Sequence, residues 1–297
     1  MSLSSEREPS SASPSAKVTF PSLETKKRAA APITALTAYD YPSARIVDEA
    51  GIDLLLVGDS LGMAVLGYDS TLPVTLDEML HHTRAVRRAV RRALLVADMP
   101  FGSYHAEKAE AVRNAARFIK EAGAEAVKIE GVRPALAKRL VEAEIPVVAH
   151  LGLLPQGVHR MGGYKVQGRT LDAAETLVAD ALAMQAAGVA LVVLEGIPRE
   201  VAARITQSLR VPVIGIGAGP DCDGQILVLH DILQLTFAPA AKFVRRYADV
   251  ASVMRDAVTH YADDVRERRF PTESESYHLS GEMRAAWEGA VAGAEKH

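Results

Sequence analysis

Eight short apolar runs, most of them separated by helical stretches, constrain the fold of this chain more than any other feature of its sequence. Each run is nearly continuous and rich in valine, isoleucine and leucine, which is typical of strands buried on both faces of a parallel sheet. The runs are ITALTAY (33–39), DLLLVGD (53–59), LLVADMP (94–100), AVKIEG (126–131), PVVAHLG (146–152), LVVLEG (191–196), VPVIGIG (211–217) and QILVLHD (225–231). Eight strands alternating with helices predict a (β/α)8 TIM barrel rather than an open doubly wound sheet.

The stretches between the runs have the features of helices. Residues 76–93 place apolar side chains among basic ones, and residues 106–123 and 171–188 each end on a glycine suited to a helix C-cap. One link is short, because only eight residues separate Gly217 from Ile226 and a parallel crossover usually needs about a dozen. The position of the seventh or eighth strand is therefore left open.

Three regions are expected along the chain. Residues 1–17 are rich in serine and proline and are expected to form a disordered leader. Residues 18–278 are expected to hold the catalytic barrel and a C-terminal helix at 249–269. Residues 279–297 are expected to form an extension with a further helix at 281–295.

Charge and cysteine content exclude several classes of protein. The net charge of −3 arises from 34 basic and 37 acidic residues, so no basic surplus predicts a nucleic-acid or anionic-membrane partner. The single cysteine, Cys222, excludes an intrachain disulfide and is interpreted as an incidental small residue rather than a nucleophile. No apolar run approaches the ~20 residues of a membrane span, and the leader lacks the apolar segment of a secretory signal. A cytoplasmic location is therefore expected.

Ionisable residues close five of the apolar runs: Asp59, Asp98, Glu130, His150 and Glu195. The C-terminal ends of barrel strands share one rim, where active sites of this fold lie, so we expect these side chains to converge. Three carboxylates from neighbouring strands would repel each other without a cation. An oxygen-only set of ligands favours Mg²⁺, which takes one or two carboxylates, waters and substrate oxygens. The alternative is a solvated rim whose acids only cap turns.

The pattern VKIEG adds a charge pair to this rim. Lys128 and Glu130 are two residues apart in a strand and share a face, so the aliphatic residues between and before them face the helices. A purely structural ion pair is the alternative interpretation. The Gly-rich segment 151–169 follows strand five and is expected to be a lid or binding loop, or else a mobile surface loop. His81 and His82 are interpreted as surface histidines, and GIGAGPDCDG as a tight turn rather than a phosphate loop.

Long segments of the sequence resemble the ketopantoate hydroxymethyltransferase family from about Val18 to Tyr277. The segments that carry the resemblance are TAYDYPSARIVDEAGID, LLVGDSLGMAVLGYDSTLPVTLDEMLHHTRAV, ADMPFGSY, VKIEG, AHLGLLPQ, GGYKVQGR, LEGIP and IGIGAGPDCDGQILVLHD. The resemblance implies a barrel of the phosphoenolpyruvate/pyruvate type. It also implies a Mg²⁺-dependent transfer of a one-carbon unit from 5,10-methylenetetrahydrofolate to 3-methyl-2-oxobutanoate, giving 2-dehydropantoate in pantothenate biosynthesis.

The resemblance also implies roles for individual residues. The implied ligands of one Mg²⁺ per subunit are Asp59, Asp98 and Glu130, the last directly or through water. The implied substrate contacts are Asp59, Ser60, Asp98, Lys128 and His150, and the implied proton acceptor is Glu195. We expect His150 to be neutral beside the metal, and leave open whether Glu195 acts on the substrate carbon or on the folate amine. A homo-oligomer, a decameric ring of dimers, is also implied.

Two other functions compete with this interpretation. A carbon–carbon lyase or phosphonomutase of the phosphoenolpyruvate/pyruvate type would also place acids and Mg²⁺ at strand ends. Such lyases commonly hold a cysteine in a catalytic lid, and Cys222 lies outside any expected lid. A non-catalytic barrel that only binds an acid would have no need of a proton acceptor such as Glu195.

Overall fold

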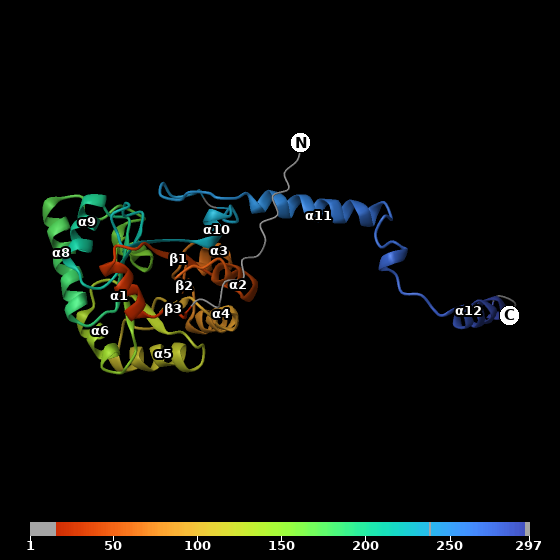
Figure 1. The fold of residues 1–297 in the computed structure, drawn as a ribbon, viewed down its shortest axis with the longest axis horizontal. Coiled ribbons are helices and arrows are strands. Elements are labelled where there is room, and N and C mark those ends of the chain that lie inside the picture. The colour runs from red at the N-terminus through yellow and green to blue at the C-terminus, as the bar shows by residue number, and fades with distance from the viewer. Residues whose placement is uncertain (1–15, 238, 295–297) are drawn as a thin grey trace. The chain divides into compact units, whose positions relative to one another are not determined.

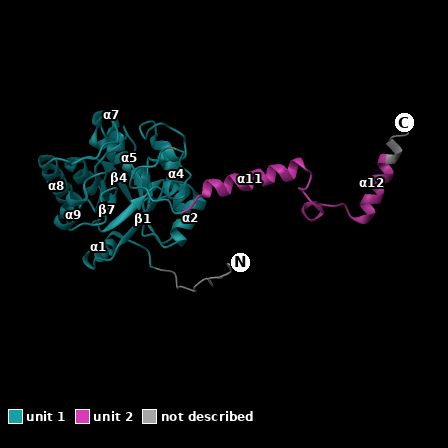
Figure 2. Ribbon diagram, turned by 90° about the horizontal axis from the view of Figure 1, so that it is seen from above, with its two compact units in different colours: residues 1–247 teal, residues 248–297 magenta. Residues whose placement is uncertain are grey.

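The computed structural model describes residues 16–237 and 239–294. Apart from Ala16 and Lys17, the expected leader at 1–17 lies outside the described residues. The chain divides into two compact units, Met1–Tyr247 and Ala248–His297 (Figure 2). The expectation that residues 18–278 form one catalytic domain stays a prediction.

Eight parallel strands close the barrel of the first unit, each hydrogen-bonded to the next and β8 to β1. They are β1 (Ile33–Thr37), β2 (Leu54–Val57), β3 (Leu94–Asp98), β4 (Ala126–Glu130), β5 (Val147–Gly152), β6 (Leu191–Glu195), β7 (Val213–Ile216) and β8 (Gly224–Leu227). The longer helices lie around the strands (Figure 1). The predicted (β/α)8 barrel is confirmed.

The helices of this unit are α1 (Phe20–Arg28), α2 (Tyr41–Glu49), α3 (Leu61–Ala64), α4 (Leu76–Ala89), α5 (Lys108–Lys120), α6 (Pro134–Val141), α7 (Val158–Met161), α8 (Leu171–Ala186), α9 (Arg199–Ser208) and α10 (Leu229–Ile232), with a 3-10 turn η1 (Pro155–Gly157). Of these, α4, α5 and α8 begin and end close to the helices predicted at 76–93, 106–123 and 171–188. In α4, Thr75 and Glu78 form a capping box that satisfies N-terminal amides. Its apolar face buries Met79, Leu80 and Val86.

The link between β7 and β8 contains no helix, only residues 217–223. The two strands still pair in parallel, with Ile214 opposite Gly224. Gly224 permits this close packing, since a Cβ there would overlap the Ile33 carbonyl. Gly217 and Gly219, with φ of 62° and 82°, turn the chain. Both strands therefore lie where the apolar runs predict them, and the expected tight turn is confirmed.

Apolar side chains form two layers of core. One lies inside the barrel and includes Leu54, Val96 and Val148. The other packs between the strands and the surrounding helices and includes Val127 and Ile129. Because successive side chains of a strand point to opposite faces, Lys128 and Glu130 of β4 point into the barrel, as predicted.

Helix α1 closes the barrel at the N-terminal ends of the strands. Its Leu23 is fully buried in the inner core. Lys26 Nζ lies 2.6 Å from Asp53 Oδ2, and Lys27 Nζ lies 2.6 Å from Asp223 Oδ2. A helix anchored by one leucine and two ion pairs stabilises this end of the barrel, away from the strand ends where the predicted site lies.

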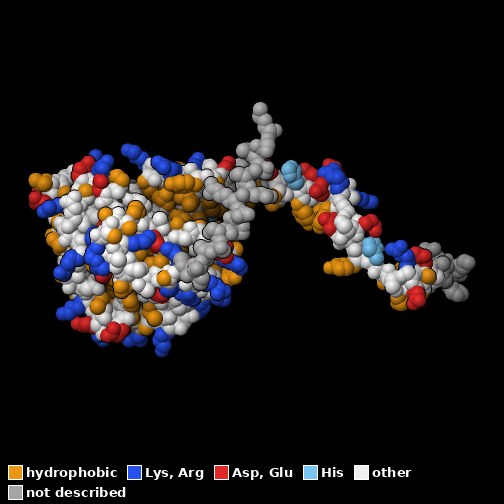
Figure 3. Space-filling model, in the orientation of Figure 1, with side chains coloured by type: hydrophobic (Ala, Val, Ile, Leu, Met, Phe, Trp, Pro, Cys, Tyr) orange, Lys and Arg blue, Asp and Glu red, His pale blue; other side chains and the backbone are white. Residues whose placement is uncertain are grey.

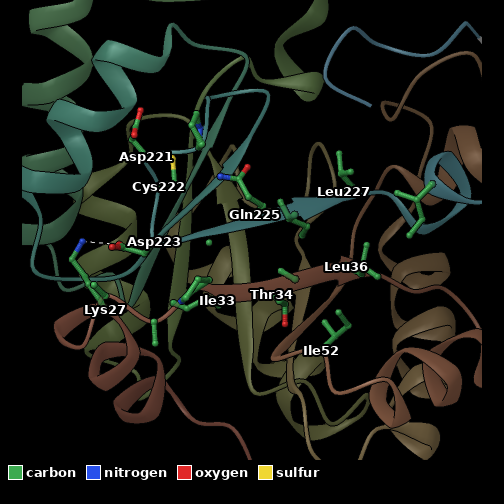
Figure 4. Close-up of a pocket in the computed structure, with 18 of the residues that line it drawn as sticks. Lys27, Ile33, Thr34, Leu36, Ile52, Asp221, Cys222, Asp223, Gln225 and Leu227 are labelled. Carbon is green, nitrogen blue, oxygen red and sulfur yellow. Dashed lines mark hydrogen bonds and ion pairs between the residues drawn. The ribbon is translucent and has the colours of Figure 1, made fainter. Parts of the chain in front are cut away.

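An open groove of about 710 Å³ lies beside β1 and β8, lined by residues that include Thr34, Leu36, Gln225 and Leu227 (Figure 4). Hydrophobic side chains also gather on the surface near β1 and α10 (Figure 3). None of the predicted site residues lines this groove. Cys222 does line it, and burial raises the pKa of its thiol, which disfavours the reactive thiolate.

The second unit contains α11 (Val250–Arg266), a 3-10 turn η2 (Glu273–Glu275) and α12 (Gly281–Ala294). Both long helices match predicted ones. Several apolar residues of α11 are exposed, among them Val253 at 67% and Val258 at 66%. Among the described residues, no helix has the length and apolarity that crossing a bilayer demands.

Candidate active site

The strand register brings the predicted site residues side by side. Asp98, the last residue of β3, pairs with Lys128 of β4, and Glu130 at the end of β4 pairs with His150 of β5. Glu195 ends β6. These five side chains point into the barrel and lie at the C-terminal ends of its strands. They therefore converge at one mouth of the barrel although they are distant in the sequence.

Asp59 and Asp98 are buried neighbours, each 3% exposed. The backbone N–H of Asp59 donates a hydrogen bond of 3.1 Å to Asp98 Oδ2. Burial raises the pKa of Asp59 well above its ordinary value, and the charges of Asp98 and Glu130 raise it further. Burial also raises the pKa of Asp98, although the Lys128 ammonium opposes this. Such a site favours a bound cation over bare carboxylates.

Lys128 places an ammonium group among these acids, and it is the one buried lysine among the described residues. Its Nζ lies 3.1 Å from Asp98 Oδ1 and 3.1 Å from His150 Nδ1. Burial alone would lower its pKa, but the carboxylates of Asp98, Glu130 and Asp59 outweigh burial and raise that pKa. Lys128 therefore stays charged and able to bind an anion.

His150 connects two carboxylates across the mouth. Its Nδ1 lies 3.4 Å from Glu130 Oε1 and its Nε2 lies 3.2 Å from Glu195 Oε2. Burial and Lys128 lower the pKa of His150, but the neighbouring carboxylates of Glu130 and Glu195 outweigh them and raise it to about 9. The neutral imidazole expected beside a bound metal stays a prediction.

Protein donors hold one oxygen of each of three carboxylates. Asp98 Oδ2 accepts from Asp59 N–H, Asp59 Oδ2 accepts from Gln156 Nε2 at 2.8 Å, and Glu130 Oε2 accepts from Gln156 N–H at 3.0 Å. Asp98 Oδ1 and Glu130 Oε1 are buried and accept no well-aligned hydrogen bond, but Lys128 Nζ lies 3.1 Å from the first and His150 Nδ1 lies 3.4 Å from the second. Nearby positive charge stabilises such buried oxygens, and a bound cation can supply it as well.

The donor set fits Mg²⁺ better than a metal held by protein ligands alone. Within residues 16–237 and 239–294, no three or more His, Cys, Asp or Glu side chains form a ready-made metal cluster. Mg²⁺ needs only one or two carboxylates and takes its other ligands from water and substrate. The neighbouring Asp59 and Asp98 meet that need, whereas direct ligation by Glu130 stays a prediction.

Three residues of the site, Gln156, Tyr104 and Tyr39, could not be identified from the spacing of residues in the sequence. Gln156, in η1, contacts both Asp59 and Glu130. Tyr104 O–H donates to Gln156 Oε1 at 2.6 Å. The hydroxyls of Tyr39 and Ser60 lie 2.8 Å apart, which holds the Ser60 side chain. All are uncharged, so no repulsion or ligand pattern points to them.

The loop after β5 is anchored at both ends. Gln156 is buried, and Gln167 N–H donates to the Gly196 carbonyl at 2.9 Å. Tyr164, between them, is half exposed, and burial together with the charges of Asp59, Glu195 and Glu130 raises its pKa. The loop therefore begins at the mouth, where Gln156 contacts Asp59 and Glu130, and the lid role stays a prediction.

The paired histidines of α4 differ from each other. His81 is exposed, as predicted. His82 is half-buried and its Nδ1 lies 2.6 Å from the Tyr39 carbonyl, so it is only partly exposed at the surface. A contact with a distant backbone oxygen gives no signal in the sequence.

Sequence comparison identifies the relatives of the chain. The family described as ketopantoate hydroxymethyltransferase matches residues 17–273. A protein of Koribacter versatilis named 3-methyl-2-oxobutanoate hydroxymethyltransferase is 65% identical over 274 residues, which cover 92% of this chain and 93% of that protein. A protein of the same name from Thermoanaerobacter sp. is 54% identical over 265 residues, covering 89% and 97%.

Solved structures share the barrel at much lower identity. A phosphonopyruvate hydrolase superposes with a TM-score of 0.55 at 14% identity, covering 94% of this chain and 99% of that one. A 2,3-dimethylmalate lyase described as a PEP mutase/isocitrate lyase superfamily member gives 0.55 at 18%, covering 93% and 99%. This likeness shows the expected phosphoenolpyruvate/pyruvate-type fold alone. The family match and the close relatives show more: the chain belongs to the ketopantoate hydroxymethyltransferase family.

Proposed function

We propose that the chain transfers a hydroxymethyl group from 5,10-methylenetetrahydrofolate to 3-methyl-2-oxobutanoate in a Mg²⁺-dependent reaction, giving 2-dehydropantoate for pantothenate biosynthesis. The observation that carries this proposal is the buried set of Asp59, Asp98, Glu130 and Lys128 at one mouth. Its support from comparison is the 65% identity to a protein named 3-methyl-2-oxobutanoate hydroxymethyltransferase.

Asp59 and Asp98 would hold the Mg²⁺, with Glu130 beside it directly or through water. When bound, the ion acts as a Lewis acid that lowers the cost of placing negative charge on the keto oxygen. Asp98 Oδ1 and Glu130 Oε1 accept no well-aligned hydrogen bond, so the ion would share them with the nearby Lys128 Nζ and His150 Nδ1.

Lys128, Ser60 and His150 would bind the keto acid. The buried Lys128 ammonium provides positive charge for the substrate carboxylate or for the oxyanion that forms. The Ser60 hydroxyl, 2.8 Å from the Tyr39 hydroxyl, is pre-oriented to donate to the substrate. His150, which lies between Glu130 and Glu195 and 3.1 Å from Lys128 Nζ, would contact a substrate oxygen beside that ammonium.

Glu195 is our proposed proton acceptor. Its side chain is 15% exposed, more than the other acids of the site, and His150 Nε2 at 3.2 Å fixes its direction. It is therefore reachable by substrate and yet oriented, as a general base requires. Its two targets, the substrate carbon and the folate amine, are distinguishable. If Glu195→Gln abolishes exchange of the substrate C–H with deuterated solvent in the absence of folate, the carbon is the target.

The proposal is tested by following the carbon of 5,10-methylenetetrahydrofolate into 2-dehydropantoate with and without Mg²⁺. Asp59→Ala and Asp98→Ala should each abolish Mg²⁺-dependent binding of the keto acid in calorimetry. Unaltered binding in both variants would refute the ligand assignment. Cleavage of a carbon–carbon or carbon–phosphorus bond without folate would instead favour the lyase or phosphonomutase alternative, which rests on fold likeness alone.

We also propose that the chain works as a homo-oligomer, the decameric ring of dimers that the family resemblance implies, in the cytoplasm. Exposed apolar residues on α11, including Val253, Met254 and Val258, support association. Light scattering should give the mass of a large assembly for the wild-type chain and a smaller mass for Val258→Asp. A wild-type monomer would overturn this part of the proposal.

A further inference from the structure

A chain of three hydrogen bonds connects one proposed metal ligand to another. The Glu130 N–H donates to the Tyr104 hydroxyl oxygen at 3.1 Å. The Tyr104 O–H donates to Gln156 Oε1 at 2.6 Å. Gln156 Nε2 then donates to Asp59 Oδ2 at 2.8 Å. The chain thus runs from the backbone of Glu130 to the carboxylate of Asp59 through two uncharged side chains.

The direction of this chain is fixed at every step. A backbone amide can only donate, so the Tyr104 oxygen accepts there and turns its proton toward Gln156. The amide oxygen of Gln156 is thereby occupied, which leaves its NH2 group facing Asp59 and the Met99 carbonyl, 3.0 Å away. Flipping the amide would set its oxygen against two acceptors. Only one orientation of Gln156 therefore satisfies all partners.

The residues of the chain are shielded from water. Gln156 is 6% exposed and Tyr104 is 3% exposed. The Arg133 guanidinium lies 5.3 Å from the centre of the Tyr104 ring, which covers that residue from the side of β4. Hydrogen bonds without competing water hold orientation more strongly than exposed ones. Loops that follow β2, β3, β4 and β5 are joined in this way.

Gln156 contacts both carboxylates through different groups. Its side-chain NH2 occupies Asp59 Oδ2 and its backbone N–H occupies Glu130 Oε2 at 3.0 Å. The other oxygen of Glu130, Oε1, faces His150 Nδ1 at 3.4 Å. Gln156 therefore holds one chosen oxygen of each carboxylate, Oδ2 of Asp59 and Oε2 of Glu130.

We propose that Gln156 is a positioning residue that orients Asp59 and Glu130 for a divalent cation, and that Tyr104 sets the direction of its amide. This inference rests on the proposed function, because it assumes that these carboxylates bind Mg²⁺. Partners that orient metal ligands commonly contribute 10- to 100-fold in metal affinity. Gln156 itself touches neither the cation nor the substrate in this role.

The test uses Gln156→Met, which keeps the length of the side chain and the backbone N–H but removes the amide. Mg²⁺ binding is titrated by calorimetry on the full chain, without keto acid or folate, and Mn²⁺ binding is followed by electron paramagnetic resonance. We expect both affinities to fall roughly 10- to 100-fold. The matched control is Gln167→Met, a glutamine of the same loop whose amide donates to the Lys165 carbonyl at 2.8 Å. Its metal affinity should equal that of the wild type.

Tyr104→Phe is the second variant and keeps the ring. It should weaken metal binding in the same direction, and the double variant should bind no more weakly than Gln156→Met, because the two residues act in series. In turnover assays the Mg²⁺ needed for half-maximal rate should rise, while kcat at saturating Mg²⁺ recovers. A general loss of structure would lower kcat at every Mg²⁺ concentration, so this split separates positioning from folding.

The outcomes separate the inference from the function on which it rests. If the wild type binds Mg²⁺ and Gln156→Met binds it equally well, the positioning role is wrong and the metal site stands. If Gln156→Met does not fold, Tyr104→Phe decides, and unaltered affinity in that variant overturns the inference. If the wild type binds neither Mg²⁺ nor Mn²⁺, the metal site of the proposed function fails, and the positioning role fails with it.

Discussion

Replacing Lys128 by Met should destabilise the metal-free protein and make it depend on Mg²⁺. The Lys128 Nζ lies 3.1 Å from Asp98 Oδ1, and the two side chains are 5% and 4% exposed. At an effective dielectric constant of about 20, such a pair interacts by roughly 5 kcal/mol. Removing one partner of a buried pair typically costs about 3–5 kcal/mol. Burial already raises the pKa of Asp98, so this carboxylate should take up a proton in the variant. The protonation should offset part of the lost stability and keep the cost near the lower end of that range.

Mg²⁺ should restore most of this stability, because it supplies the positive charge that the variant lacks. An ion at about 100 times its dissociation constant stabilises a protein by roughly 2.7 kcal/mol. Chemical denaturation in EDTA measures the stability lost in the variant, and denaturation in excess Mg²⁺ measures the stability that the ion restores. We expect the gain from Mg²⁺ to be larger in Lys128→Met than in the wild type, since no ammonium then competes for Asp98. Turnover should stay low, because the charge that we propose binds the substrate is missing.

Lys26→Met is the matched control. Lys26 Nζ lies 2.6 Å from Asp53 Oδ2, another buried acid, but Arg92 also pairs with Asp53 at 2.9 Å. This variant should lose some stability, and Mg²⁺ should not restore it. Equal gains from Mg²⁺ in Lys128→Met and Lys26→Met would refute the reasoning, because the ion would then act without regard to the acids at the mouth.

Three further predictions test other parts of the molecule. Glu195→Gln should lower kcat by about 10²–10⁴ while calorimetry gives nearly unchanged binding of Mg²⁺ and keto acid; an equal loss of binding would make Glu195 a ligand. Gly152 has φ of 93° and a Cβ there would overlap the Glu195 carbonyl, so Gly152→Ala should cost roughly 1–3 kcal/mol in denaturation and lower kcat/KM. Burial raises the pKa of Asp53, but hydrogen bonds from Lys26, Thr34 and Arg92 outweigh burial and lower it. The stability that Asp53 contributes is therefore present above its unfolded pKa of about 3.9 and is lost as pH falls through the lower folded value. Asp53→Asn should be less stable than the wild type at neutral pH, and the difference should close in acid; a pH-independent difference would contradict this.

The strands were predictable because burial on both faces leaves a nearly unbroken apolar run, and the barrel followed from eight such runs. The place of β8 was hard to judge because its pairing with β1 depends on the close approach of Gly224 to Ile33, a contact between distant residues. Helix α1 was not predicted. It holds a single buried apolar residue, Leu23, and its place depends on ion pairs with acids far along the chain.

The charged part of the site was predictable for a different reason. Acids that follow buried strands are costly without a partner, so their presence there indicates a ligand. Gln156 and Tyr104 lack such a signal, because they are uncharged and lie in irregular loops. What makes them part of the site is the direction of their hydrogen bonds, which exists only after the loops have met.

The contrast between the two ends of the barrel shows how to separate structural acids from functional ones. Before β2, both oxygens of Asp53 are held, one by Lys26 and Thr34 and the other by Arg92. At the mouth, Asp98 Oδ1 and Glu130 Oε1 accept no well-aligned hydrogen bond and face only charged neighbours, Lys128 Nζ at 3.1 Å and His150 Nδ1 at 3.4 Å. The acids at both ends are buried, so burial alone does not distinguish them. An acid whose oxygens all accept hydrogen bonds contributes to the fold, whereas a buried acid with an oxygen stabilised by charge alone is a candidate for binding a ligand.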